Sequence, residues 1–209
     1  VAFYVIPHVI NHALGLASLE TMEFMRRGMN FIWGPPVGAP ILLAAFLTHF
    51  LSSLFALYRR STLRMPFWEA AQIGLGILIF PIILIHVIGT AVAGNIIGFD
   101  TTYEYQITVL WILKPMRGVQ QSLMLIIVWG HLWVGLHFWL RLKSWYQNWF
   151  AIIYGFAVVT PILSLLGFVR IGRQLKQIST GDPGFLKRVM EPVNNYGAES
   201  VNNLFGLEY

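Results

Sequence analysis

The sequence contains no cysteine among its 209 residues. This absence excludes disulfides, iron–sulfur clusters, c-type haem attachment and thiolate zinc sites from the chain. Charged residues are also scarce, at 11% of the sequence, whereas hydrophobic residues make up 56%. Such a composition lies outside the usual range of soluble domains and predicts a protein of the lipid bilayer.

Five apolar stretches are long enough to cross a hydrocarbon core of about 30 Å, which takes about 20 residues of helix. They cover residues 1–19, 38–58, 67–94, 119–140 and 149–169. Tryptophans gather near the ends of these stretches, as they do at membrane interfaces. We therefore predict an all-α membrane protein, a transmembrane helical bundle of five spans over residues 1–171, with a sixth span expected in a full-length form.

The remaining residues, 172–209, carry polar and charged side chains that interrupt every apolar run. We expect this tail to lie on the membrane surface or to contact a partner. Arg59, Arg60 and Arg64 follow the second span, and Arg141 and Lys143 follow the fourth, which predicts that both turns are cytoplasmic. Because the basic residues mark span ends and form no stripe, the net charge of +5 does not indicate a nucleic-acid partner.

All six histidines fall inside the predicted spans. Ionisable side chains at membrane depth are costly and therefore indicate function. One histidine alone is explained equally well by an interhelical hydrogen bond, but six of six favour ligation of haem iron, copper or zinc. A proton relay is disfavoured because no Asp or Glu lies in the middle of a span.

Helical rise places four of these histidines in two level pairs, His12 with His86 and His49 with His131. A haem between two imidazoles also needs small residues one turn along the ligand's own face, although such residues are common at any membrane helix contact. The residues in those positions are Gly15, Ser52, Ser53, Gly89 and Gly135. We predict that the first four spans form a four-helix bundle that binds two haems.

Other residues receive supporting roles. His8 shares a face with His12 and could replace it as the ligand. His137 is expected to serve a haem propionate or a quinone headgroup, and Trp133 is the tryptophan expected to touch a cofactor. The residues that could hold propionates by charge-assisted hydrogen bonds, or act only as topology anchors, are Arg59, Arg60, Arg64 and Arg141.

The segment HLWVGLHFWLR at 131–141 resembles the haem-ligand helix of succinate dehydrogenase and fumarate reductase cytochrome b subunits. Four segments together, at 11–23, 49–70, 86–94 and 130–142, resemble the six-span cytochrome-like membrane domain fused to ferredoxin and class III adenylate cyclase modules in bacteria. The resemblance covers about residues 8–170.

The resemblance implies a dihaem b-type anchor in the bacterial inner membrane that exchanges electrons with the quinone pool and couples redox state to an output. It assigns the iron ligands to His12, His49, His86 and His131. The chain departs from that pattern, since it has five spans, no four-cysteine ferredoxin loop and no cyclase domain. It is therefore expected to be part of a larger polypeptide or a separate subunit, with ferredoxin, cyclase or other subunits as partners and a homodimer as one arrangement.

Two alternatives belong to other classes. A structural or pigment-binding subunit of a respiratory or photosynthetic complex would need only single axial histidines, so paired histidines would be superfluous. A copper or zinc transporter would need clusters of Met or Asp near a broken helix. Met22, Met25 and Met29 have helical spacing but lie at a span end, and we expect them to serve packing.

Overall fold

The computed structural model describes residues 1–92, 94 and 100–205, which are helical and contain no strand. Over these residues, four helices are long and apolar enough to cross a membrane, which is compatible with a multi-pass membrane protein. They are α3 (Gly38–Tyr58), α4 (Phe67–Val87, continued by the π-helical segment η2, Ile88–Val92), α7 (Pro115–Leu140) and α8 (Tyr146–Gly181). The predicted second span has the bounds of α3, and the third and fourth overlap α4 and α7; residue 93 of the third lies outside the described residues.

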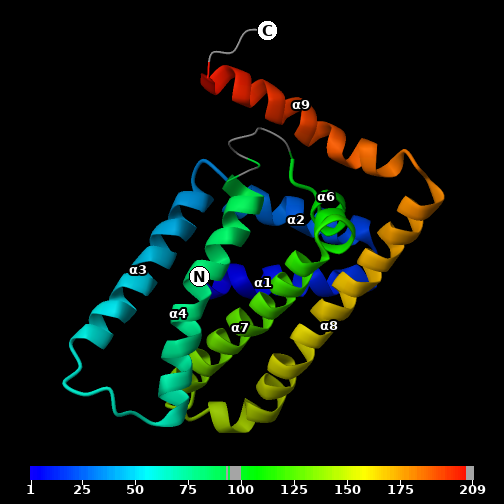
Figure 1. Ribbon diagram of the computed structural model, residues 1–209. Coiled ribbons are helices and arrows are strands. Elements are labelled where there is room, and N and C mark those ends of the chain that lie inside the picture. Colours follow the sequence, from blue (N-terminus) through cyan, green and yellow to red (C-terminus); the bar gives the residue numbers. More distant parts are fainter. Residues whose placement is uncertain (93, 95–99, 206–209) are drawn as a thin grey trace.

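The two turns that carry the predicted cytoplasmic arginines, 59–66 and 141–145, lie at the same end of the spans, here called the basic end (Figure 1). The opposite end, here called the capped end, holds α2 (Leu19–Trp33), α6 (Tyr103–Thr108) with the π-helical segment η3 (Val109–Leu113), and α9 (Phe185–Phe205). Local capping fixes two of these helices, because Ser18 accepts from the Thr21 N–H and Thr102 from the Tyr105 N–H.

The main buried apolar cluster lies at the capped end. Its buried members come from α2, α6, α8 and α9, and they are Met22, Tyr103, Ile107, Ile171, Leu175 and Phe185. Residues 172–181, predicted to belong to the polar tail, thus continue α8, and the predicted boundary at 171 falls inside a helix. The burial of Met22 agrees with the packing role expected for the methionines of α2. The last predicted tail residues, 206–209, lie outside the described residues.

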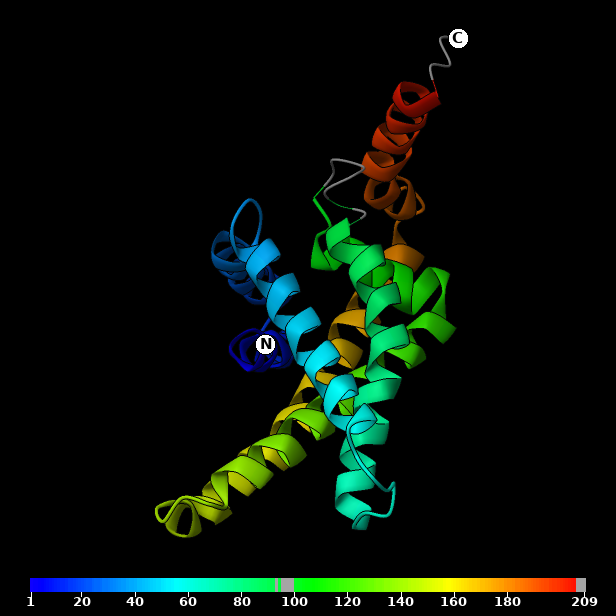
Figure 2. The same ribbon diagram turned by 90° about the vertical axis from the view of Figure 1, so that its left-hand side faces the viewer.

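The first predicted span, 1–19, is not one of the four long helices. The segment forms a twelve-residue helix, α1 (Ala2–Ala13), followed by the 3₁₀ turn η1 (Leu14–Leu16), and α2 then begins after Ser18. Twelve residues of helix extend about 18 Å, well short of the hydrocarbon core. Figures 1 and 2 show α1 lying across the direction of the spans. Over the described part of the chain, the structure therefore has four helices of spanning length and not the five predicted.

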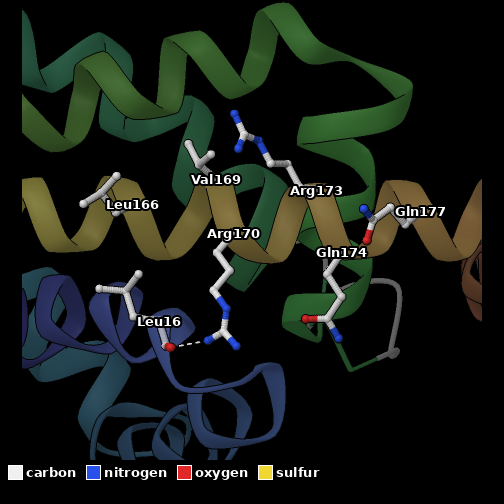
Figure 3. A pocket seen from close by; sticks show the side chains of 7 residues that line it. All are labelled: Leu16, Leu166, Val169, Arg170, Arg173, Gln174 and Gln177. Carbon is white, nitrogen blue, oxygen red and sulfur yellow. Dashed lines mark hydrogen bonds between the residues drawn. The ribbon is translucent and has the colours of Figure 1, made fainter.

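Helix α1 is held on α8 by backbone contacts. The Ser164 hydroxyl, fully buried, donates to the Val9 carbonyl oxygen at 2.8 Å. Gly15 and Gly167 let the two backbones touch, since a β-carbon at Gly15 would lie 2.8 Å from the Gly167 carbonyl oxygen. Arg170 then donates to carbonyl oxygens at the end of η1, among them that of Leu16 (Figure 3). The fifth predicted span, which the sequence analysis did not include in the four-helix haem bundle, thus supports α1.

Helix α3 stands apart from the others. All of its residues are described, and Gly38 is the one that is buried. Its contact with α4 is aromatic, with the Phe50 ring stacked on Phe80 at a centroid distance of 4.3 Å. Figure 2 shows α3 diverging from α4 and α7 towards the capped end. Leucine and phenylalanine side chains exposed along α3 suit contact with lipid better than contact with water.

Candidate functional site

Five of the six histidines lie in two clusters of rings. On α3 and α7, the ring centroids of His49 and His131 are 6.1 Å apart. On α1 and α4, the ring centroids of His8 and His86 are also 6.1 Å apart. The planes within the pairs are inclined by 71° and 63°. Four different helices therefore bring four imidazoles into two pairs of the same separation.

This separation equals the value for two axial ligands of one metal ion. With metal–nitrogen bonds of about 2.0 Å on both sides, the ligating nitrogens stand about 4 Å apart and the ring centroids, about 1 Å behind them, about 6 Å apart. Aromatic rings in simple contact span a similar range of distances. The distance alone therefore does not distinguish ligation from ring contact. The hydrogen bonds made by Nδ1 of one histidine in each pair provide the further evidence.

His131 is oriented from the neighbouring helix α4. Its Nδ1 lies 3.1 Å from the backbone carbonyl oxygen of Gln72, which can only accept, so Nδ1 carries the proton and Nε2 is left unprotonated. A backbone carbonyl that fixes the tautomer in this way is the usual second partner of a metal-bound histidine. Gly76 gives the ring its space, because a β-carbon there would lie 3.0 Å from Cε1 of His131.

The space beside Gly135, predicted as clearance for a haem, is partly taken by the Gln72 side chain. A β-carbon at Gly135 would lie 2.8 Å from Nε2 of Gln72. The other amide atom of this side chain, Oε1, is buried and has no hydrogen-bond partner among the described residues. Unsatisfied amide groups are rare inside proteins, so Gln72 lines this site with an acceptor still available.

His49 is exposed, although its ring on α3 lies close to the ring of His131 on α7. Protein atoms therefore do not enclose the imidazole on α3. The small residues one turn along, Ser52 and Ser53, are exposed as well, and the Ser53 hydroxyl donates to the His49 carbonyl oxygen at 2.8 Å. A flat group lying between α3 and α7 would thus meet small side chains, of which Ser53 already has its hydroxyl hydrogen-bonded.

His86 is oriented from α7. Its Nδ1 lies 2.9 Å from the side-chain oxygen Oε1 of Gln121, which accepts from Nδ1–H and leaves Nε2 free. Gly89, the predicted clearance residue, faces open space, with nothing within 4 Å of a β-carbon built there. The π-helical segment η2 begins two residues after His86, and π-helical turns are frequent at functional sites.

His8, and not His12, is the ring beside His86. The His12 ring contacts His8 at 4.9 Å and Tyr103 at 5.7 Å, while His8 also stacks on Tyr4 at 5.3 Å. The sequence favoured His12 because it has the same depth as His86 and because Gly15 follows it. Gly15, however, is buried against the α8 backbone and offers no clearance to a cofactor.

His137 lies apart from both ring pairs. Its Nδ1 is 2.9 Å from the hydroxyl of Tyr146, at the start of α8. Trp133 packs its ring against Trp129 and Phe156 between α7 and α8, at centroid distances of 5.6 and 5.7 Å. The Trp133 Nε1–H is buried and has no acceptor among the described residues.

Three of the four arginines predicted to hold propionates, Arg59, Arg60 and Arg141, have side-chain partners within the protein, whereas, among the described residues, Arg64 contributes only its backbone N–H, which donates to Thr62. Arg60 forms an ion pair with Glu69 at 2.5 Å. The guanidinium of Arg59 lies over the Phe55 ring at 5.8 Å, and that of Arg141 over Phe138 at 5.2 Å. A role as topology anchors at the basic end explains these contacts, and they require no haem propionate.

Sequence analysis missed the residues that orient the rings: Gln72, Gly76, Gln121 and Tyr146. The prediction of the sites rested on ionisable groups and on small residues of the ligand's own helix. Glutamine at membrane depth is the signal that could have found two of them, because an amide there also needs a partner. Gly76 acts on a ring of the facing helix, and no single-helix pattern reveals such a relation.

Among the described residues, no group of three or more His, Cys, Asp or Glu could hold a metal ion. No family model, curated protein or solved structure matches the sequence.

Proposed function

We propose that the chain is a membrane electron-transfer domain that binds two b-type haems, one between His49 and His131 and the other between His8 and His86. The observation that carries the proposal is the repeated ring separation of 6.1 Å across two pairs of helices. In both pairs, one histidine has its Nδ1 engaged by a protein oxygen, so its Nε2 is available to iron.

Haem suits these residues better than a bare metal ion does. A porphyrin supplies four of the iron's six ligands, so a pair of imidazoles completes the coordination. Zinc or copper would need further protein ligands, and a pigment magnesium would use only one ring of each pair. The exposed face of α3 around His49 and the open side of Gly89 provide room for a flat ring.

The haems, when bound, would supply reversible one-electron chemistry inside the bilayer. The protein would tune it through the axial imidazoles and through the oxygens of Gln72 and Gln121, because a hydrogen bond at Nδ1 makes the ligating nitrogen more basic. One pair lies towards the basic end and one towards the capped end, so electrons could move across the membrane.

The partner we propose is the quinone pool, with an output module attached to this chain or to a neighbouring subunit. The support is the resemblance of the four histidine segments to the cyclase-linked membrane domain, together with four spans that would place both sites in lipid. The bacterial inner membrane is the location that this partner implies.

The test is the haem content of histidine variants purified from a haem-sufficient host. We expect two haems per wild-type chain by the pyridine haemochromogen assay. His49→Ala and His131→Ala should each lose the same haem, and His8→Ala and His86→Ala the other. His137→Ala is the matched control on α7 and should retain both.

The variants His8→Ala and His12→Ala decide between the two candidate ligands of α1. The ring contacts predict loss of one haem in His8→Ala and retention of both in His12→Ala. The opposite pattern would return the ligand to His12. Retention of both haems in all the ligand variants would refute the proposed sites.

A further inference from the structure

The hydrogen bond between His137 and Tyr146 joins the end of α7 to the start of α8. His137 is partly buried, whereas Tyr146 is only 3% exposed, which is unusual for a residue next to a turn at a helix end. Their rings lie 5.7 Å apart, and Phe150 approaches the His137 ring at 6.1 Å. The buried phenol therefore holds the imidazole in one orientation.

Because Nδ1 of His137 is hydrogen-bonded to Tyr146, Nε2 is the ring nitrogen that remains available. The described part of the chain provides no hydrogen-bond partner for it. No second histidine ring contacts it, in contrast with the five other histidines. Axial pairing thus does not explain this imidazole. A tyrosine hydroxyl can donate or accept, so Nε2 can donate to a carbonyl or accept from a hydroxyl.

The groups around His137 are aromatic and reach the lipid side. Phe150, which contacts the His137 ring, is 40% exposed, and Trp145, which packs on Tyr146 at a centroid distance of 6.2 Å, is 48% exposed. The cations that follow His137 in the sequence are engaged with rings, Arg141 over Phe138 and Lys143 over Trp139 at 5.7 Å. No carboxylate contacts His137 within the described residues. This setting suits a flat, uncharged ligand that arrives through the bilayer better than it suits an anionic propionate.

We infer that His137 and Tyr146 form a binding site for the headgroup of a 1,4-quinone or its quinol, with one ligand oxygen hydrogen-bonded to Nε2 of His137. Tyr146 is the positioning residue, because it acts through the imidazole. The inference rests on the proposed exchange of electrons with the quinone pool and assigns that exchange to the basic end. Helical rise puts His137 about 9 Å from His131 along α7, beside the nearer histidine pair.

The experiment measures binding of a short-tailed 1,4-benzoquinone, carbon-13 labelled at its carbonyls, to the full chain in nanodiscs. Tryptophan fluorescence quenching gives the Kd, and the infrared carbonyl band reports a hydrogen bond to the quinone. The variants are His137→Leu, Tyr146→Phe and the double variant. The matched control is Tyr154→Phe, which alters a 60% exposed tyrosine two turns further along α8.

We expect His137→Leu to raise the Kd about ten-fold, equivalent to about 1.4 kcal/mol, and to abolish the hydrogen-bonded band. Tyr146→Phe should raise the Kd by a few-fold and broaden that band, and the double variant should bind no more weakly than His137→Leu. Tyr154→Phe should resemble the wild type. Haem content should stay unchanged throughout.

Three outcomes would overturn the inference: no quinone binding by the wild type, unchanged binding in both His137→Leu and Tyr146→Phe, or haem loss in His137→Leu with unchanged quinone binding. The last would assign His137 to a haem propionate. If His137→Leu does not fold, Tyr146→Phe still decides, since its ring is kept. A wild type that lacks haem but binds quinone through His137 would refute the proposed function and retain this site.

Discussion

Gly76 of α4 lies directly against the imidazole of His131 on α7, with 3.0 Å between a β-carbon built at position 76 and Cε1 of the ring. The ring cannot retreat freely, because its Nδ1 is held by the Gln72 carbonyl oxygen of the same helix α4. One helix thus both orients the imidazole and limits the space beside it.

Gly76→Ala should therefore disturb the His49–His131 pair, and Gly76→Val should do so more strongly. We expect at least half of the haem of this pair to be lost in the valine variant, measured as the haem-to-protein ratio. Gly74→Ala is the matched control two residues away, where a β-carbon meets nothing within 4 Å. Equal haem content in the Gly74 and Gly76 variants would argue against this arrangement.

Gln121→Leu removes the acceptor that orients His86. Loss of such a partner commonly weakens metal binding 10–100-fold, so we expect selective loss of the His8–His86 haem during dilution. Gln120→Leu is the control, because Gln120 instead accepts from Arg117. The prediction fails if both variants lose haem at the same rate.

Gly167 sets the position of α1, since a β-carbon there would strike the backbone carbonyl of His12. Gly167→Ala should push α1 away from α8, destabilise the fold by about 1–3 kcal/mol through overpacking, and lower the haem content of the His8–His86 pair. Gly155→Ala on the same helix should be neutral, because its β-carbon would have open space. Thermal unfolding and haem content measure both effects, and similar behaviour of the two variants would contradict the close contact.

The capped end should loosen in acid. Burial by itself would raise the pKa of Glu23, but the Arg26 guanidinium and the Tyr103 backbone N–H outweigh it and lower that pKa below its ordinary value of 4.5. Because the folded pKa is depressed, the stabilisation is complete above pH 4.5 and is lost as the pH falls through the folded pKa.

Hydrogen exchange measures this effect at the Tyr103 amide, which donates to Glu23 at 3.2 Å. Protection should decline as the pH is lowered below 4.5, and Glu23→Gln should lose about 2 kcal/mol of protection at neutral pH, as for a hydrogen bond to a charged group. Glu191→Gln, an exposed carboxylate on α9, should change neither value. Protection that does not decline as the pH is lowered below 4.5 would be evidence against this role of Glu23.

Hydropathy predicted the long spans well, because α3, α4 and α7 are uniform apolar runs. It failed at residues 1–19, where the apolar run is continuous but the helix is interrupted. Leu14–Leu16 form a 3₁₀ turn, and Ser18 caps a new helix. It also did not predict that the last helix continues to Gly181, where Ile171 and Leu175 extend one buried face of α8 among polar neighbours. A window average does not detect such a face.

The pairing of histidines could be predicted in part from helical rise alone. That argument brings α3 and α7 together at His49 and His131, but it assumes helices parallel to the membrane normal. Helix α1 lies across the spans, so depth counted along its sequence selects His12 where the structure places His8 beside His86. Groups that orient the rings, such as Gln72, act through contacts between helices. The spacing of residues along a single helix therefore does not predict them.

The most direct test of two imidazole-ligated haems is the dithionite-reduced minus air-oxidised spectrum of the purified chain, with haem and protein quantified on the same sample. The account predicts a b-type α-band, two haems per chain and a six-coordinate low-spin ferric state. A colourless protein that remains so after incubation with haem, or a five-coordinate haem bound by one histidine, would contradict it.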